Sequence, residues 1–183
     1  MRHTLKARLL SVVGLLAATS IGLAQIERLD LAQMMAKCDG AMVGKIVKHE
    51  VFRTDVPTKE MYFTRLTIEG RDLVQDGAKT IEVVYPGGFI SRNEGNFNSE
   101  APHADDVKVG NEVVIFHCYE ENIGNNVSGN SIYAWHGGLY RVVDTARNGK
   151  VVLGRGEGYA ISSNRKLDAL DKDVTRLFEE GRK

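Results

Sequence analysis

The sequence has no excess of either charge. Its 24 Lys and Arg residues balance 24 Asp and Glu residues, so the formal net charge at pH 7 is zero. Nucleic acids and anionic membranes attract proteins through clustered positive charge. The balance therefore argues against both partners, although nucleic acid is the commonest ligand of small β-barrels.

The sequence also lacks the motifs of common enzyme classes. It contains no Gly-x-Ser-x-Gly, a motif that marks serine hydrolases. The glycine-rich residues 154–158 follow a short β segment and precede no helix of the phosphate-binding kind. No two histidines stand at the i, i+4 or His-x-His spacing that brings two imidazoles to one metal ion. We therefore expect no catalytic residue, no cofactor and no metal site.

Cysteine is scarce, and the two residues present, Cys38 and Cys118, form no Cys-x-x-Cys pair. This spacing argues against redox or zinc chemistry. In an oxidising compartment an even pair favours a disulfide, which for a loop of about 80 residues would contribute roughly 4–5 kcal/mol in the chain-entropy model. The alternative is two buried thiols on separate strands.

The first 24 residues have the pattern of a secretory signal peptide. Arg2, Lys6 and Arg8 precede an apolar run from Leu9 to Ala24 that ends in small residues. The alternative is an uncleaved anchor, but a run of about 16 residues is shorter than the roughly 20 that span a bilayer. We expect cleavage after Ala24 and a periplasmic or secreted product without stable membrane insertion.

Residues 25–183 are expected to form a single domain. About 159 residues are enough for one domain with a sizeable core. Because the signal segment carries three basic residues and no acid, its removal lowers the net charge to about −3. No internal repeat or domain boundary interrupts this part of the chain.

Most of that domain has the pattern of β-strands. Segments of alternating apolar and polar residues, rich in β-branched and aromatic side chains, predict short strands. Gly44 lies within the first of them and suggests a bulge or a sharp bend. Pro86 followed by Gly87 fits the centre of a type II turn. The predicted strands are residues 41–52, 61–68, 80–85, 112–118, 132–135, 139–143 and 151–153.

Helices are predicted at both ends of the domain, over residues 26–37 and 165–180. The second has an apolar stripe at helical spacing, which we expect to pack on its own domain. Five or six short strands with helical caps favour a mostly β fold, a small five- to six-stranded barrel that is closed or partly open. A β-sandwich is the alternative.

Two polar segments are predicted to be loops, residues 89–109 and residues 121–131. A loop of more than about 15 residues is uncommon in a compact domain and is often a binding loop or a mobile flap. We expect these loops to form the recognition surface. The candidate ligand-contacting residues are Phe89, Arg92, Phe97, His103, Tyr133 and Trp135.

Three of the aromatic residues, Tyr133, Trp135 and Tyr140, lie close together in the sequence. If exposed, they could stack on a sugar or grip a peptide. If buried, they are ordinary barrel core.

Two further groups of residues are candidate chemical sites. His103 with Asp105 and Asp106 could hold a divalent cation, or could simply form a solvated acidic loop. His117 beside Cys118 could lower the thiol pKa and generate a nucleophile. Adjacent residues of a strand point to opposite faces, which argues against direct contact between these two side chains.

The order of these features resembles a group of uncharacterised exported bacterial domains, which in turn look like the OB-fold barrel of tissue inhibitors of metalloproteinases and netrin-like modules. The segments that carry the resemblance are residues 38–46 (CDGAMVGKI), 62–66 (YFTRL), 86–88 (PGG), 109–116 (VGNEVVIF) and 135–142 (WHGGLYRV). They are turn and core residues, so the resemblance implies the fold and not an activity.

The resemblance stops short of the inhibitors' mechanism. Tissue inhibitors chelate the metal of their target through an N-terminal cysteine, whereas the mature chain here would begin at Gln25 and Cys38 lies inside it. We therefore expect an exported, non-catalytic module that binds a protein or a small ligand. An inhibitor of an exported protease and a hydrolase using His117 and Cys118 are the alternatives.

Overall fold

The computed structural model describes residues 30–56 and 59–181, in which β-strands predominate. The predicted signal peptide and its cleavage site lie outside the described residues. The elements are α1 (Leu31–Lys37), β1 (Gly40–Val56), β2 (Lys59–Asp72), β3 (Gly77–Pro86), β4 (Gly88–Ser91), β5 (Glu94–Asn96), β6 (Glu112–Gly124), β7 (Val127–Ile132), the 3-10 helix η1 (Trp135–Gly138), β8 (Leu139–Thr145), β9 (Gly149–Val152), β10 (Arg165–Lys166) and α2 (Leu167–Gly181).

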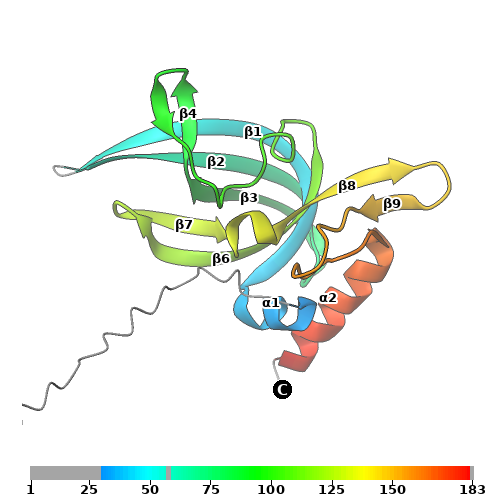
Figure 1. The fold of residues 1–183 in the computed structure, drawn as a ribbon. Helices are drawn as coiled ribbons and strands as arrows, with labels where there is room; N and C mark the ends of the chain where they lie inside the picture. The colour runs from blue at the N-terminus through cyan, green and yellow to red at the C-terminus, as the bar shows by residue number, and fades with distance from the viewer. Residues whose placement is uncertain (1–29, 57–58, 182–183) are drawn as a thin grey trace, which may run out of the picture.

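Five of these strands close into a barrel, as Figure 1 shows. Around it the order is β1-β2-β3-β7-β6, and β6 pairs with β1 to complete the ring. All neighbours are antiparallel except β3 and β7, which pair in parallel at Val83 and Val84. Numbered within the barrel, this is the 1-2-3-5-4-1 arrangement of an OB-fold. The predicted barrel is confirmed over the sandwich.

The barrel wall is buried on both sides by two hydrophobic cores. Along β6, Val113 and Ile115 point into the barrel, whereas Val114 and Phe116 point outward into a core that α1 and α2 cover. A strand buried on both faces needs apolar residues at every position. The outer core explains why residues 113–116 form the strongest apolar run after the signal segment.

Two glycines let β1 and β2 approach closely. Gly44 and Gly70 lie opposite each other. A Cβ atom on Gly70 would lie 2.1 Å from the Val43 carbonyl oxygen, so no larger residue fits without moving the strands. The bulge expected at Gly44 lies instead between Ile46 and Lys48.

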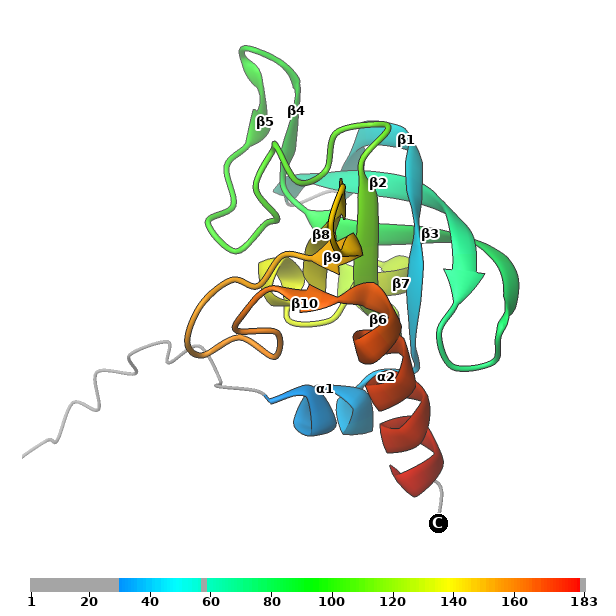
Figure 2. The same cartoon turned by 90° about the vertical axis from the view of Figure 1, so that its right-hand side faces the viewer.

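The two helices pack at the end of the barrel away from the β4–β5 hairpin, as Figure 2 shows. Helix α1 begins with a capping box between Asp30 and Gln33, so the described helix is shorter than predicted; residues 26–29 are not described. Helix α2 buries Leu167, Leu170 and Val174. The prediction that this helix packs on its own domain is therefore confirmed.

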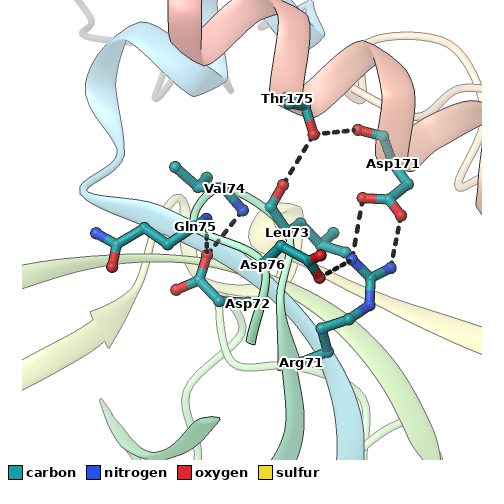
Figure 3. A network of polar contacts seen from close by, with 8 residues as sticks. All are labelled: Arg71, Asp72, Leu73, Val74, Gln75, Asp76, Asp171 and Thr175. Carbon is teal, nitrogen blue, oxygen red and sulfur yellow. Dashed lines mark hydrogen bonds and ion pairs between the residues drawn. The ribbon is translucent and has the colours of Figure 1, made fainter. Parts of the chain in front are cut away.

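Polar contacts join α2 to the turn between β2 and β3 (Figure 3). The Arg71 guanidinium forms an ion pair with Asp171 of α2 at 2.6 Å, and the Thr175 hydroxyl donates to the Leu73 carbonyl oxygen at 3.1 Å. Asp72 accepts hydrogen bonds from the backbone N–H groups of Val74 and Gln75 and so holds the turn in shape.

Both predicted loops contain strands. Residues 89–109 include the β4–β5 hairpin, which rises above the barrel in Figures 1 and 2. Residues 121–131 are the end of β6 and most of β7, joined by Asn125 and Asn126, which both have positive φ angles. Asparagine tolerates that conformation, so the polar composition reflects a tight hairpin turn. Polarity alone does not separate a hairpin from a loop.

The predicted disulfide is absent, because Cys38 and Cys118 are both free thiols. Cys38 packs in the outer core, whereas the Cys118 Sγ atom lies 3.3 Å from the Ser131 hydroxyl of the neighbouring strand β7. Burial raises the pKa of both thiols. The alternative of two buried thiols on separate strands is correct only in part: both are thiols, but Cys38 caps α1 and Cys118 is partly buried.

In the described part of the chain, no helix is long and apolar enough to cross a bilayer.

Candidate functional site

A cleft of about 570 Å³ opens at the mouth of the barrel, beneath the β4–β5 hairpin. Its floor consists of inward-facing residues of three neighbouring strands: Val51 of β1 lies opposite Thr64 of β2, which lies opposite Tyr85 of β3. The volume is within the range of about 300–1,000 Å³ that is usual for ligand sites. We call this feature the mouth cleft. Its lining is His49, Val51, Thr64, Tyr85, Gly88, Phe89, Val107, His136, Arg155 and residues 96–99 and 101–104.

A sharp turn carries the chain from the barrel wall into the roof of the cleft. The Thr64 hydroxyl donates to the Gly87 carbonyl oxygen at 2.7 Å, and Gly87 has the positive φ that the predicted type II turn requires. A Cβ atom on Gly88 would lie 2.5 Å from the Thr64 hydroxyl oxygen. The two glycines therefore allow β4 to rise directly over the floor.

The roof is fixed to the barrel by side-chain amides. The Asn98 amide nitrogen donates to the Pro86 carbonyl oxygen at 2.8 Å, and its amide oxygen accepts from the Glu100 N–H. Farther along, the Asn111 amide donates to the Asp105 carbonyl oxygen at 2.7 Å. These bonds satisfy backbone groups of the segment and of the barrel wall, and so they define the path of the chain from residue 97 to 111.

Two phenylalanines at the cleft are unusually exposed. Phe97 is 80% exposed and Phe89 is 53% exposed, and both line the cleft. Ile90, the next residue of β4, is also exposed. Single apolar side chains on a surface are ordinary, but a group of them at the rim of a cavity marks an interaction site.

Three of the four described histidines line the mouth cleft: His49, His103 and His136. Burial lowers the pKa of His49. The His103 ring accepts a hydrogen bond at Nδ1 from the Asp105 N–H at 3.2 Å. Over residues 30–56 and 59–181, no group of three or more His, Cys, Asp or Glu residues has the geometry to hold a metal ion.

The charged groups near the cleft are already paired. Arg155 of the lining forms an ion pair with Asp106 at 2.7 Å, and both side chains are largely buried. Asp105 pairs with Lys108 at 2.6 Å, and this hydrogen bond lowers the Asp105 pKa. The two acids considered with His103 as cation ligands are thus engaged by cations of the protein itself. The lining of the cleft is mostly apolar, and its one arginine is paired within the protein.

The structure brings most of the predicted ligand-contacting residues together. Phe89, Phe97 and His103 line the mouth cleft, and Tyr133 and Trp135 line an adjoining pocket that shares His136 with it. Arg92 belongs to the turn of the β4–β5 hairpin and lines neither cavity. Tyr140 is fully buried in the outer core, as the core alternative predicted.

Sequence reasoning missed the floor of the cleft. His49, Thr64 and Tyr85 belong to strands whose other inward-facing residues fill the core. Alternation indicates which residues point inward, but it does not indicate where along a strand the core ends and a cavity begins.

His117 and Cys118 do not form a catalytic pair. His117 lies in the barrel interior against Gly40, whereas Cys118 is on the opposite face of β6 beside Ser131. Burial lowers the pKa of His117 to about 4 and raises that of Cys118. A base is needed within hydrogen-bonding reach of a nucleophile, and these two side chains point apart.

Comparisons of the chain with protein-family models, with curated proteins and with solved structures found no match. The resemblance to exported bacterial domains and to netrin-like modules therefore stays a prediction. The assignment to an OB-like barrel depends on the strand order, and the function has to be argued from the cleft.

Proposed function

We propose that this domain is a non-catalytic binding module that recognises a protein partner through the mouth cleft. The observation that carries the proposal is the position of Phe89 and Phe97, which are exposed at the rim of a cavity of about 570 Å³. Buried aromatic anchors dominate the energy of protein interfaces. Covering these two rings would remove a large apolar area from water.

The neutrality of the cleft defines the kind of group that fits it. The Arg155–Asp106 ion pair leaves the lining without an unpaired charge from either residue. A charged ligand group would lose its hydration without gaining a counter-ion. An apolar side chain of the partner does not have this cost of lost hydration. Tyr85 and His49 offer polar contacts at the floor.

The cleft is also well organised in the free protein. Its floor is barrel wall, and its roof is held by the Asn98 and Asn111 amide bonds. Binding to a preformed site avoids most of the entropy loss of ordering a loop. A rigid cleft with exposed aromatic rims is therefore suited to capture of a short apolar segment.

The test is selection of peptides from a random display library on the purified protein. We expect enriched peptides with apolar or aromatic residues and affinities of roughly 1–100 μM, typical of short segments in a single cleft. Phe97→Ser or Phe89→Ser should weaken them about tenfold or more, because each removes an anchor. Tyr119→Ser is the matched control, since Tyr119 is 60% exposed and belongs to β6 outside the cleft.

Peptides that bind wild type and both Phe variants equally would overturn the proposal, as would a library that enriches nothing. Peptides weakened equally by Tyr119→Ser would indicate nonspecific adhesion to exposed aromatic rings. Inhibition of an exported protease stays a prediction.

A further inference from the structure

A second, smaller pocket of about 310 Å³ adjoins the mouth cleft on the other side of His136. Three aromatic residues line it, Tyr133, Trp135 and Tyr159, together with Met34 of α1 and Glu100. We call it the aromatic pocket. It is separate from the site of the proposed function, although the two cavities share one wall.

The backbone is strained where it presents the tryptophan. Ala134 and Trp135 have φ angles of 50° and 51°, a left-handed conformation that bulky residues rarely adopt. Gly138 closes the turn, and a Cβ atom there would lie 2.0 Å from the Tyr133 carbonyl oxygen. Strain of this kind persists only where the surrounding structure enforces it, and it concentrates at binding sites.

His136 fixes two other walls of the pocket. Its Nδ1 atom lies 3.0 Å from the Glu100 carbonyl oxygen, and its Nε2 atom lies 3.1 Å from the Tyr159 hydroxyl. A carbonyl oxygen only accepts, so Nδ1 carries a proton, and in the neutral ring Nε2 accepts from Tyr159. The backbone N–H of His136 also donates to the Glu100 carbonyl oxygen at 3.0 Å. Tyr159 and Glu100 are thereby held at the rim.

The charge of the lining favours a cation. Glu100 contributes a carboxylate that is 57% exposed, and the lining contains neither lysine nor arginine. Aromatic rings attract cations through their negative faces, and several rings around one cavity recognise alkylated ammonium groups. A nearby carboxylate adds a direct attraction that an apolar ligand would not feel.

We propose that the aromatic pocket binds a quaternary ammonium group. The group enters between the rings of Tyr133, Trp135 and Tyr159, and the Glu100 carboxylate pairs with its charge. Such a cation suits the pocket better than a primary ammonium ion, because its methyl groups lose less hydration and contact the rings directly. The ligand is a small free molecule, since the pocket is compact and bounded on one side by α1.

The chain has its own reporter for this event, because Trp135 is its only tryptophan. The experiment titrates the full protein with choline and follows Trp135 fluorescence, with free N-acetyl-tryptophanamide as the blank. The matched probe is 3,3-dimethyl-1-butanol, which has the shape of choline without its charge. A third arm uses a trimethyl-lysine dipeptide to distinguish a peptide-borne group from a free one. Sodium chloride keeps the ionic strength constant.

We expect saturable binding of choline that is about tenfold tighter than that of the neutral alcohol. Glu100→Gln should weaken choline by roughly two- to fivefold and leave the alcohol unchanged, because only the charge attraction is lost. Glu121→Gln is the control, an exposed carboxylate on β6 outside the pocket. Trp135→Leu, followed by calorimetry, should reduce the preference for the cation while the protein stays folded.

Equal affinity for choline and the alcohol would overturn the proposal, because the pocket would then be merely apolar. No saturable signal with choline or the dipeptide at millimolar concentration would also overturn it. Tighter binding of the dipeptide than of choline would keep the ammonium site but contradict a free ligand. None of these outcomes affects the test with the Phe89 and Phe97 variants, which measures peptide binding at the mouth cleft.

Discussion

The two ends of the barrel are built in opposite ways. At the helix-covered end, Leu170 and Val174 are fully buried and Met34 is 1% exposed. At the mouth, Phe97 is 80% exposed and Phe89 is 53% exposed. The chain thus buries aliphatic residues under two helices at one end and leaves two phenylalanine rings, one on β4 and one just after β5, in water at the other. The residues buried under α2 and the two exposed rings proposed to contact a ligand at the mouth lie at opposite ends of the barrel, so we expect that each set can be changed without the other.

The largest effect is expected from a substitution in the core of the helix-covered end. Leu170→Ala should lower the free energy of unfolding by about 2–5 kcal/mol, because it removes buried methyl groups and leaves a cavity between α2 and the barrel. Phe97→Ala, at the mouth, should change it by less than about 0.5 kcal/mol. Urea unfolding followed by circular dichroism measures both. Comparable losses in the two variants would show that the mouth carries stability as well.

A second test concerns His117, a polar residue whose poorly satisfied ring lies in the barrel interior beside Gly40. His117 is 5% exposed, and neither of its ring nitrogens has a hydrogen-bond partner in the described structure. Burial is the main reason that its pKa falls to about 4; Lys79 lowers it further, and Asp72 and Asp39 oppose the shift. The ring is therefore neutral in the folded protein at pH 5 and largely protonated in the unfolded chain.

This difference makes the stability depend on pH. Between about pH 6.5 and pH 4 the unfolded state binds more protons, so stability is fully present above that window and is lost as the pH falls through it. We expect the free energy of unfolding to drop by about 2 kcal/mol between pH 7 and pH 5 because of this one residue. His117→Leu should remove that drop and cost little at pH 7, since an unpartnered polar group is replaced by an apolar one.

The control for this prediction is His103→Gln, which changes an exposed histidine at the mouth. It should leave the pH dependence of unfolding as it is in the wild type. An unchanged pH dependence in His117→Leu would mean that other groups produce the acid sensitivity.

The same contrast explains which features could be predicted from sequence. The strand over residues 112–118 was predicted because burial on both faces makes it a continuous apolar run, and the C-terminal helix because burial on one face imposes a helical period on its apolar residues. The β4–β5 hairpin was not predicted, because only one of its faces contacts the rest of the protein and its sequence is largely polar. The mouth cleft depends on where β1, β2 and β3 extend beyond the core, which is a property of register and not of composition.

The cysteines show a further limit. Cys38 and Cys118 come to the same end of the barrel, since the Asp39 N–H donates to the His117 carbonyl oxygen at 3.0 Å. The spacing of the two cysteines in the sequence does not reveal that the fold brings them to the same end of the barrel. Nor does it reveal the direction in which each side chain points. The Cys118 Sγ atom lies 3.3 Å from the Ser131 hydroxyl, and the two cysteines remain free thiols.

The smallest effect is expected from a substitution at the contact between α2 and the barrel. The Thr175 hydroxyl donates to the Leu73 carbonyl oxygen at 3.1 Å and connects the helix to the β2–β3 turn (Figure 3). Thr175→Val keeps the shape and removes the bond, so it should lower the free energy of unfolding by about 1 kcal/mol. Thr145→Val is the matched control, because the Thr145 hydroxyl serves only the exposed β8–β9 turn.

Thr175→Val should leave peptide and choline binding unchanged, because α2 lines neither the mouth cleft nor the aromatic pocket. A loss of stability accompanied by a loss of binding would mean that the two ends are coupled through the barrel wall. A loss of stability alone would show that α2 stabilises the fold without affecting binding at either cavity. This is the result expected if stability and binding depend on opposite ends of the barrel.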